Sequence, residues 1–219
     1  MCSVSFGQQT TVTGRISGPA DLSGAVVWIS LIGDSTPVQA SPALQPRHLL
    51  LQKKKTFSPH LLVVPLGSAV EFPNGDPFFH NVFSLFEGKR FDLGLYEAGS
   101  SRAVVFNRAG VSYIFCNIHP EMSAVVVALN TPYYGISDRT GAITIPNVPA
   151  GNYDLEIWHE RVLPETLNSL KRRVSISQTS NSLGVVRLTE QRNLSQAHKN
   201  KYGRDYDNPA PNTPGYARP

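Results

Sequence analysis

Glycine and proline interrupt this chain so often that long regular helices are excluded. The sequence contains 17 glycines and 17 prolines among 219 residues, so one of the two occurs about every six residues. Helical hydrophobic periodicity is nearly absent between them, whereas short apolar or β-branched runs are frequent. This pattern is typical of many short strands connected by turns. We therefore expect an all-β protein.

The chain is long enough for one large β domain or two small ones, each with its own core. Hydrophobic residues make up 41% of it and charged residues only 16%, which is typical of a folded protein. The net charge is +4, but the basic clusters at 53–55 and 171–173 have no interleaved aromatic residues. We expect no nucleic-acid partner. The clusters are either solvated strand edges or a surface that attracts an acidic partner protein.

Strand signals fall into three stretches of the chain. The first stretch has runs at 11–17 and 25–32, followed by a loop or linker over 34–48. The second has runs at 49–53, 61–64, 70–72, 80–86, 103–106, 111–116 and 124–129. The third has runs at 142–145, 153–158, 174–176 and 184–188, with a helical turn at 165–170. Residues 189–219 lose this periodicity, which predicts an extended or disordered tail.

The two cysteines, Cys2 and Cys116, allow a disulfide on count alone. Cys2 lies in a terminal Met-Cys-Ser sequence. That sequence is the remnant of a removed leader, a site for lipid attachment, or an incidental terminal thiol. No run approaches the roughly 18 apolar residues that a membrane-spanning helix requires. We expect no transmembrane segment, and a lipid anchor at Cys2 remains open.

The segment Phe-Cys-Asn-Ile-His-Pro-Glu-Met at 115–122 is the most informative part of the sequence. It places Cys116, His119 and Met122 in a Cys-x2-His-x2-Met pattern at the end of a predicted strand. A tight loop that leaves a strand can bring these three side chains to one point. Upstream, His80 lies on the edge of another predicted strand. Together these residues supply two imidazoles, a thiolate and a thioether.

A trigonal His2Cys set with a weak axial methionine is typical of electron-transfer copper. The soft thiolate and thioether favour Cu(I), and the imidazoles keep Cu(II) bound. A rigid β scaffold allows the ion to change charge with little rearrangement. We therefore expect one type 1 copper ion bound by His80, Cys116, His119 and Met122.

Other uses of these residues fit the pattern less well. Structural zinc usually has paired cysteines, and methionine is not among its usual ligands. A c-type haem requires Cys-x-x-Cys-His, which the sequence lacks. A Cys/His protease pair would need an orienting Asn or Asp and an oxyanion hole in a recognisable frame.

The remaining histidines and the absence of a paired motif argue against a second copper site. We expect His48, His60, His159 and His198 to be surface or hydrogen-bonded residues. No His-x-His pair occurs in the sequence, so the trinuclear cluster of multicopper oxidases has no candidates. We therefore expect a carrier rather than an enzyme.

Residues 49–129 resemble a cupredoxin, the small blue-copper fold of plastocyanin and amicyanin. The resemblance rests on His-Asn-Val at 80–82 and on the loop at 116–122, whose length is closest to that of amicyanin. It implies an antiparallel Greek-key sandwich with copper near one end and the His119 ring edge at the surface, where the electron leaves. It also implies that Asn81 links the two ligand loops by hydrogen bonds and that Pro120 stiffens the second loop. Ordinary turn chemistry is the alternative for both residues.

Two flanking segments resemble the halves of a carboxypeptidase regulatory-like domain. Its opening half matches residues 13–28 and its closing half matches residues 137–155. Insertion of a cupredoxin into a surface loop of a small β-sandwich accounts for their separation. We therefore expect residues 10–33 and 131–188 to form one discontinuous β-sandwich, and residues 44–130 to form the copper domain.

The combined architecture resembles bacterial plastocyanin-like and methylamine-utilisation-type proteins. The leading hypothesis is a type 1 copper electron carrier in the periplasm or elsewhere outside the cytoplasm. It would dock a dehydrogenase or cytochrome through the surface around His119. The alternatives are a copper storage or delivery protein that uses the same ligands, and a structural or glycan-contacting β module that has lost its metal.

Overall fold

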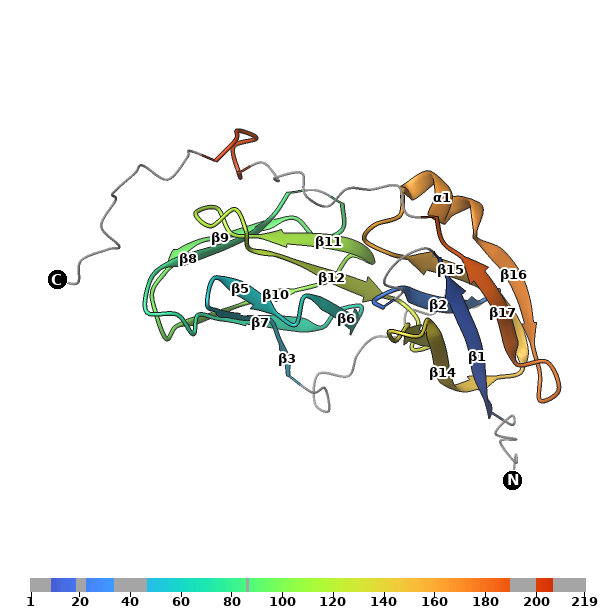
Figure 1. Ribbon diagram of the computed structural model, residues 1–219. Helices are drawn as coiled ribbons and strands as arrows, with labels where there is room; N and C mark the ends of the chain where they lie inside the picture. The colour runs from blue at the N-terminus through green and yellow to red at the C-terminus, as the bar shows by residue number, and fades with distance from the viewer. Residues whose placement is uncertain (1–8, 19–22, 34–46, 86, 190–199, 207–219) are drawn as a thin grey trace, which may run out of the picture. The chain divides into compact units, whose positions relative to one another are not determined.

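The computed structural model describes residues 9–18, 23–33, 47–85, 87–189 and 200–206. The chain divides into two compact units (Figure 1). Unit 1 comprises Met1–Pro37 and Thr131–Leu194, and unit 2 comprises Val38–Asn130 and Ser195–Pro219. Nearly all regular structure in both units is strand, so the expected all-β fold is confirmed. Within the described residues, no helix is long and apolar enough to cross a membrane.

Unit 1 is built from two sheets and one short helix. The first sheet has the order β14 (Ala142–Pro149), β1 (Gln9–Ser17), β17 (Ser182–Arg187). The second has the order β13 (Tyr134–Ile136), β2 (Val26–Leu31), β15 (Gly151–Trp158), β16 (Arg172–Ile176). Helix α1 (Pro164–Ser169) has its proline in the first turn, where the missing N–H costs no hydrogen bond.

The two N-terminal strands of unit 1 pair with strands from the far side of unit 2 in the sequence. β1 runs antiparallel to β14 and parallel to β17, and β2 runs antiparallel to β13 and β15. Val12 and Ile16 of β1 are fully buried, because they point from the strand into the apolar core. The domain bounds predicted from the sequence, 10–33 with 131–188, stay a prediction. The relation of unit 1 to carboxypeptidase regulatory-like domains stays a prediction.

Unit 2 contains a five-stranded sheet, a three-stranded sheet and a two-stranded hairpin. The five-stranded sheet has the order β6 (Leu61–Pro65), β12 (Ser123–Leu129), β11 (Gly110–Phe115), β8 (His80–Ser84), β9 (Phe91–Tyr96). The three-stranded sheet has the order β10 (Ser101–Val105), β7 (Ala69–Pro73), β3 (His48–Leu49). The hairpin joins β4 (Leu51–Lys53) to β5 (Thr56–Ser58).

One apolar core is shared by both sheets of unit 2. Phe72 of β7, Val82 of β8 and Val126 of β12 are all fully buried in it, and so are Cys116 and Met122. Burial of this apolar surface provides most of the stability of such a unit. Cys116 and Met122 of the candidate site therefore belong to this core.

The pairing in unit 2 differs from the antiparallel arrangement that the resemblance implied. β6 runs parallel to β12, and β3 runs parallel to β7. Neither pair is consecutive in the chain, so a crossover rather than a tight turn connects its members, and a crossover permits a parallel pair.

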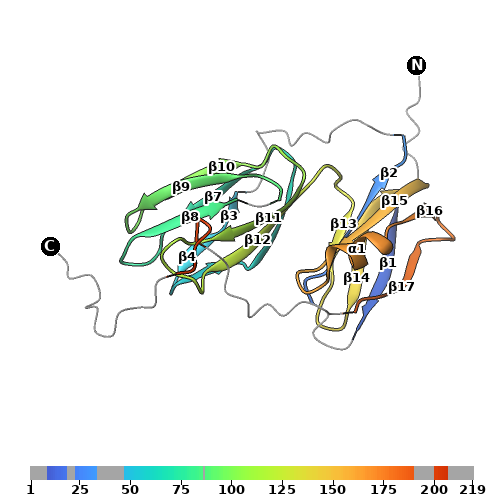
Figure 2. The ribbon, with the colours of Figure 1, turned by 90° about the horizontal axis from the view of Figure 1, so that it is seen from above.

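Residues 200–206 differ from the unstructured tail that the sequence predicts over 189–219. They form a hydrogen-bonded turn that contacts the loop after β11, and this turn is coloured red in Figures 1 and 2. The other tail residues, 190–199 and 207–219, lie outside the described residues, and so does Cys2, the predicted lipid-anchor site.

Candidate metal centre

The loop at 116–122 is a tight connection between β11 and β12. The last strand pair before it is Phe115 with Ser123. The backbone N–H of Met122 donates to the His119 carbonyl at 3.0 Å, which closes a turn with Pro120 in its second position. Proline is favoured there because its ring fixes φ near the value the turn requires. A second bond, from the Cys116 N–H to the Met122 carbonyl at 3.3 Å, closes the base of the loop.

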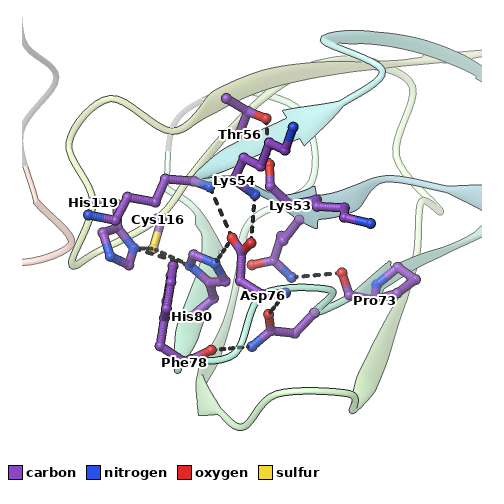
Figure 3. Close-up of polar contacts among 12 residues, drawn as sticks. Lys53, Lys54, Thr56, Pro73, Asp76, Phe78, His80, Cys116 and His119 are labelled. Carbon is purple, nitrogen blue, oxygen red and sulfur yellow. Dashed lines mark hydrogen bonds and ion pairs between the residues drawn. The ribbon is translucent and has the colours of Figure 1, made fainter. Parts of the chain in front are cut away.

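His80, at the start of β8, faces this loop. The Nδ1 atoms of His80 and His119 lie 3.1 Å apart. The Cys116 Sγ lies 3.8 Å from the His80 Nδ1 and 3.6 Å from the His119 Nδ1 (Figure 3). Within the part of the chain that the structure describes, this is the one group of three His, Cys, Asp or Glu side chains placed to share a metal ion.

The three donor atoms fit a single ion. Zinc, the best-characterised metal with such donors, lies about 2.0–2.3 Å from imidazole nitrogen and thiolate sulfur. Two donors of one ion therefore lie no more than about 4.2 Å apart for two nitrogens and about 4.4 Å apart for nitrogen and sulfur. All three separations in this cluster are shorter than these limits. The donor types, two imidazoles and one thiolate, are those of trigonal copper sites.

The environment of the cluster is buried on one side only. His80, Cys116 and Met122 are fully buried, whereas the His119 side chain is partly exposed. Met122 packs in the same core cluster as Cys116, and its backbone is bonded to both Cys116 and His119. The cluster therefore reaches solvent through His119, the residue whose ring edge the resemblance places at the surface.

Burial raises the pKa of the Cys116 thiol, but backbone N–H groups directed at the sulfur oppose this shift. These N–H groups belong to Asn81, Ile118 and His119, and they stabilise the thiolate, which is the form that binds metals. Burial, together with the nearby His80 and Lys55, lowers the pKa of His119. The neutral imidazole, which is the metal-binding form, is therefore favoured at His119.

A buried carboxylate, which the sequence analysis missed, fixes the orientation of His80. The Asp76 Oδ2 lies 2.9 Å from the His80 Nε2, and both side chains are buried. With Nε2–H donating to the carboxylate, Nδ1 is left free to bind a metal, as in the carboxylate–histidine–metal arrangement of many sites. The signal was present in the sequence, because Asp76 precedes His80 by four residues.

The Asp76 carboxylate is itself held by the turn of the β4–β5 hairpin. Lys54 and Lys55 both adopt the left-handed conformation, with φ of 55°. Their backbone N–H groups donate to the carboxylate at 2.6 and 2.9 Å (Figure 3). Burial raises the pKa of Asp76, but the bonds from Lys55, His80 and Lys54 outweigh this effect and leave the pKa below its ordinary value. Asp76 is therefore ionised at neutral pH.

The resemblance implies that Asn81 links the two ligand loops by hydrogen bonds, and its side chain bonds to a neighbouring strand. Its Nδ2 donates to the Asp92 Oδ1 on β9 at 2.8 Å. The connection to the second loop is made instead by the Asn81 backbone N–H, which is directed at the Cys116 sulfur. The sequence pattern contains Asn81 but cannot show which of its groups makes the contact.

The other histidines stay apart from this cluster in the described part of the chain. His48 lies in strand β3 rather than in the predicted loop. The His60 ring is hydrogen-bonded to the Ser123 carbonyl at 3.2 Å, and the His159 ring accepts from the Arg161 N–H at 3.3 Å. His198 lies outside the described residues.

No protein-family model matches this sequence, and no curated protein is significantly similar to it. Several solved structures are similar in fold over part of the chain. A purple cupredoxin from Nitrosopumilus maritimus is 24% identical, with a TM-score of 0.34, and the match covers 37% of this chain and 99% of that protein.

Two further structures cover about half of this chain. A reduced Cu(I) form of an amicyanin mutant is 20% identical, with a TM-score of 0.36, and covers 47% of this chain and 98% of its own. A copper-containing nitrite reductase from Thermus scotoductus is also 20% identical, with a TM-score of 0.37, and covers 52% of this chain but only 28% of its own. At such low scores, a functional conclusion must depend on the residues of the site itself.

Proposed function

We propose that unit 2 binds one type 1 copper ion and carries single electrons. The proposed ligands are His80 Nδ1, Cys116 Sγ, His119 Nδ1 and, as the weak axial ligand, Met122. The observation that carries this proposal is the convergence of two imidazole nitrogens and a buried sulfur within 3.1–3.8 Å of one another. The soft sulfur donors suit Cu(I), and the imidazoles suit Cu(II).

The protein's own contribution to electron transfer is a site that does not rearrange. Copper, when bound, supplies the one-electron couple between Cu(I) and Cu(II). His80 is fixed through Asp76, and Cys116 is fixed by three N–H groups and by the core around it. Side chains that are held in this way cannot relax far when the charge of the site changes, which favours fast transfer. The partly exposed His119 is the proposed route for the electron.

The surface next to His119 suits an acidic redox partner, such as a dehydrogenase or cytochrome. The Phe78 ring lies 5.5 Å from the His119 ring, and the Lys55 ammonium lies 5.9 Å from the Phe78 ring. Lys53, Lys54 and Lys55 are all exposed. Positive charge beside the electron route would speed the encounter with a negatively charged protein. We further propose that this carrier works in the periplasm or elsewhere outside the cytoplasm, with Cys2 as a candidate lipid anchor.

Addition of Cu(II) to the purified apoprotein tests the proposal directly. We expect an intense visible band from thiolate-to-copper charge transfer and narrow hyperfine splitting in the EPR spectrum. A weakly coloured complex that loses copper readily would favour storage or delivery instead. No binding of copper at all would contradict both functions and leave a structural β module.

The axial ligand is tested by replacing Met122 with leucine. Met122 is fully buried, and leucine at this position fills a similar volume without the thioether. We expect copper to stay bound and the reduction potential to rise, because Cu(II) loses an electron-donating axial ligand and the site becomes more hydrophobic. Voltammetry of both proteins measures the change, and an unchanged potential would show that Met122 is not a ligand.

A further inference from the structure

The turn at 200–206, which no sequence pattern connects with the site, is held in shape by one side chain. The Asn200 Oδ1 accepts from the N–H groups of Tyr202 and Arg204 at 2.9 and 3.1 Å. Backbone bonds from Asn200 to Arg204 and from Gly203 to Asn200 close the turn at 2.8 and 2.9 Å. Gly203 has a positive φ of 74°, which glycine adopts without strain. The turn therefore has a defined conformation of its own.

This turn contacts the ligand loop at two consecutive residues. The Tyr206 hydroxyl donates to the Cys116 carbonyl at 2.7 Å. The Lys201 backbone N–H donates to the Asn117 Oδ1 at 2.9 Å. Both bonds hold the part of the loop between the two proposed ligands Cys116 and His119.

A third contact ties the turn to the neighbouring strand. The Lys201 ammonium lies 2.8 Å from the Asp92 Oδ2 on β9. The other oxygen of Asp92 accepts from Asn81, the residue that follows His80. The turn thus spans from the loop of Cys116 and His119 to the strand beside His80, and it contacts the surroundings of all three.

Tyr206 and Tyr202 differ in a way that separates a structural contact from a surface one. Tyr206 is partly buried, and burial raises the pKa of its phenol, so it stays a neutral hydrogen-bond donor. Tyr202 belongs to the same turn but is 71% exposed. Of the two hydroxyl groups, that of Tyr206 is the one that donates a hydrogen bond to the ligand loop in the described structure.

We propose that residues 200–206 form a strap that holds the loop between Cys116 and His119 in its metal-binding conformation and slows the escape of a bound ion. Tyr206 and Lys201 are positioning residues, because they act through the Cys116 carbonyl, Asn117 and Asp92 and not on the ion. The effect on the ion rests on the proposed copper function. The restraint on the loop does not, because it consists of hydrogen bonds and an ion pair within the protein.

Hydrogen–deuterium exchange of the full-length apoprotein tests the restraint. In Tyr206→Phe, amide exchange in the peptide covering 116–122 should be about two- to tenfold faster, the range expected from loss of one hydrogen bond. Tyr202→Phe is the matched control, because the Tyr202 hydroxyl interacts with Lys201 inside the turn and not with the loop. Its exchange should stay close to that of the unchanged protein. Equal exchange in all three proteins would overturn the proposal.

Transfer of copper from the loaded proteins to an excess of a strong Cu(I) chelator tests the consequence. We expect Tyr206→Phe to release copper about two- to tenfold faster than Tyr202→Phe. Lys201→Met should change release in the same direction by less, because its ion pair is partly screened by solvent. Faster exchange with no copper bound would support the strap and contradict the copper function. Bound copper with unchanged release and exchange would contradict the strap alone.

Discussion

Asp138 in unit 1 and Asp76 in unit 2 use the same device with different results. Asp138 closes a turn by accepting from the backbone N–H groups of Thr140 and Ala142 at 2.8 and 3.0 Å. Asp76 holds the turn of the β4–β5 hairpin by accepting from the backbone N–H groups of Lys54 and Lys55. Asp138 is exposed and holds its own turn. Asp76 is buried and, besides its turn, also holds the His80 ring.

The difference shows that one added contact, from a turn-closing carboxylate to a histidine ring, makes a turn part of a candidate metal site. Hydrogen bonds from Thr140 and Ala142 lower the pKa of Asp138, and hydrogen bonds also leave the pKa of Asp76 below its ordinary value despite burial. Both carboxylates are therefore ionised at neutral pH. The charge of Asp138 lies near Arg15, whereas the charge of Asp76 lies beside His80 of the candidate metal cluster.

Replacement of Cys116 by serine should have the largest effect, because it removes the one thiolate of the candidate cluster in unit 2. We expect complete loss of the intense visible band, measured by absorption after addition of Cu(II). Cys2→Ser, which changes the other cysteine of the chain, is the control and should keep the colour. Blue colour that survives Cys116→Ser would mean that copper binds elsewhere and that the contrast between the units is wrong.

A matched pair, Asp76→Asn and Asp138→Asn, tests the two turns against each other. Loss of the carboxylate behind a metal-binding histidine typically lowers metal affinity about 10- to 100-fold. We expect a loss of that size in Cu(II) affinity for Asp76→Asn, with a higher reduction potential because a negative charge is gone. Asp138→Asn should leave both unchanged. Competition with a Cu(II) chelator and voltammetry measure the two quantities, and equal effects would remove the distinction.

The basic clusters at 171–173 in unit 1 and at 53–55 in unit 2 differ in whether their charges are paired. In unit 1, Lys171 pairs with Glu156 at 2.7 Å and Arg173 lies 3.6 Å from Asp154. In unit 2, the exposed side chains of residues 53–55 make no ion pair in the described part of the chain. Within the described residues, the basic cluster of unit 2 is therefore not neutralised by ion pairs, which suits the proposed attraction of an acidic partner.

Neutralisation of either cluster by glutamine tests this contrast. With Lys53, Lys54 and Lys55 replaced, the rate of electron transfer to a negatively charged redox protein should fall about tenfold or more at low salt. Replacement of residues 171–173 should leave the rate within about twofold of the original. Stopped-flow kinetics over a range of ionic strengths measures both. A loss that persists at high salt would point to a defect of the site rather than of steering.

The smallest effect is expected from Tyr153→Phe in unit 1. The buried Tyr153 hydroxyl donates to the Pro149 carbonyl at 2.8 Å, and burial raises its pKa to about 12. Because the neutral phenol is favoured in the folded state, this contribution to stability is intact below about pH 10 and is lost as the pH rises towards 12. The variant should lose about 1 kcal/mol at neutral pH but show less alkaline destabilisation.

Both tryptophans, Trp28 and Trp158, lie in unit 1, so denaturant unfolding followed by tryptophan fluorescence reports on that unit. Measurements at pH 7 and about pH 11 give the two differences. The same alkaline decline in the variant and in the original protein would assign it to another group.

Short-range patterns predicted most of the fold and the centre of the site. The apolar runs at 61–64, 111–116 and 124–129 correspond to β6, β11 and β12. Strand β9 was missed because Asp92 and a positive-φ Gly94 interrupt its apolar pattern. Strands β5 and β13 were missed because each has only three residues.

The surroundings of the site were much less predictable than its centre. Cys116, His119 and Met122 lie within one short loop, so their spacing carries the signal. The backbone N–H groups of Lys54 and Lys55 have no sequence signature, because any residue with that backbone could donate them. Tyr206 acts on a carbonyl 90 positions away, and no local pattern predicts such a contact.

The strand order of unit 1 has a consequence for the order in which this protein is made. β1 and β2 are synthesised before unit 2, but they belong to different sheets, and within the described residues each pairs with strands that follow residue 130. All strands of unit 2 are synthesised in the interval. Two strands with unpaired edges must therefore wait while the inserted unit folds, and unpaired edges are where nascent β proteins aggregate. We therefore expect β1 and β2 to depend on protection by a chaperone until the later strands are made.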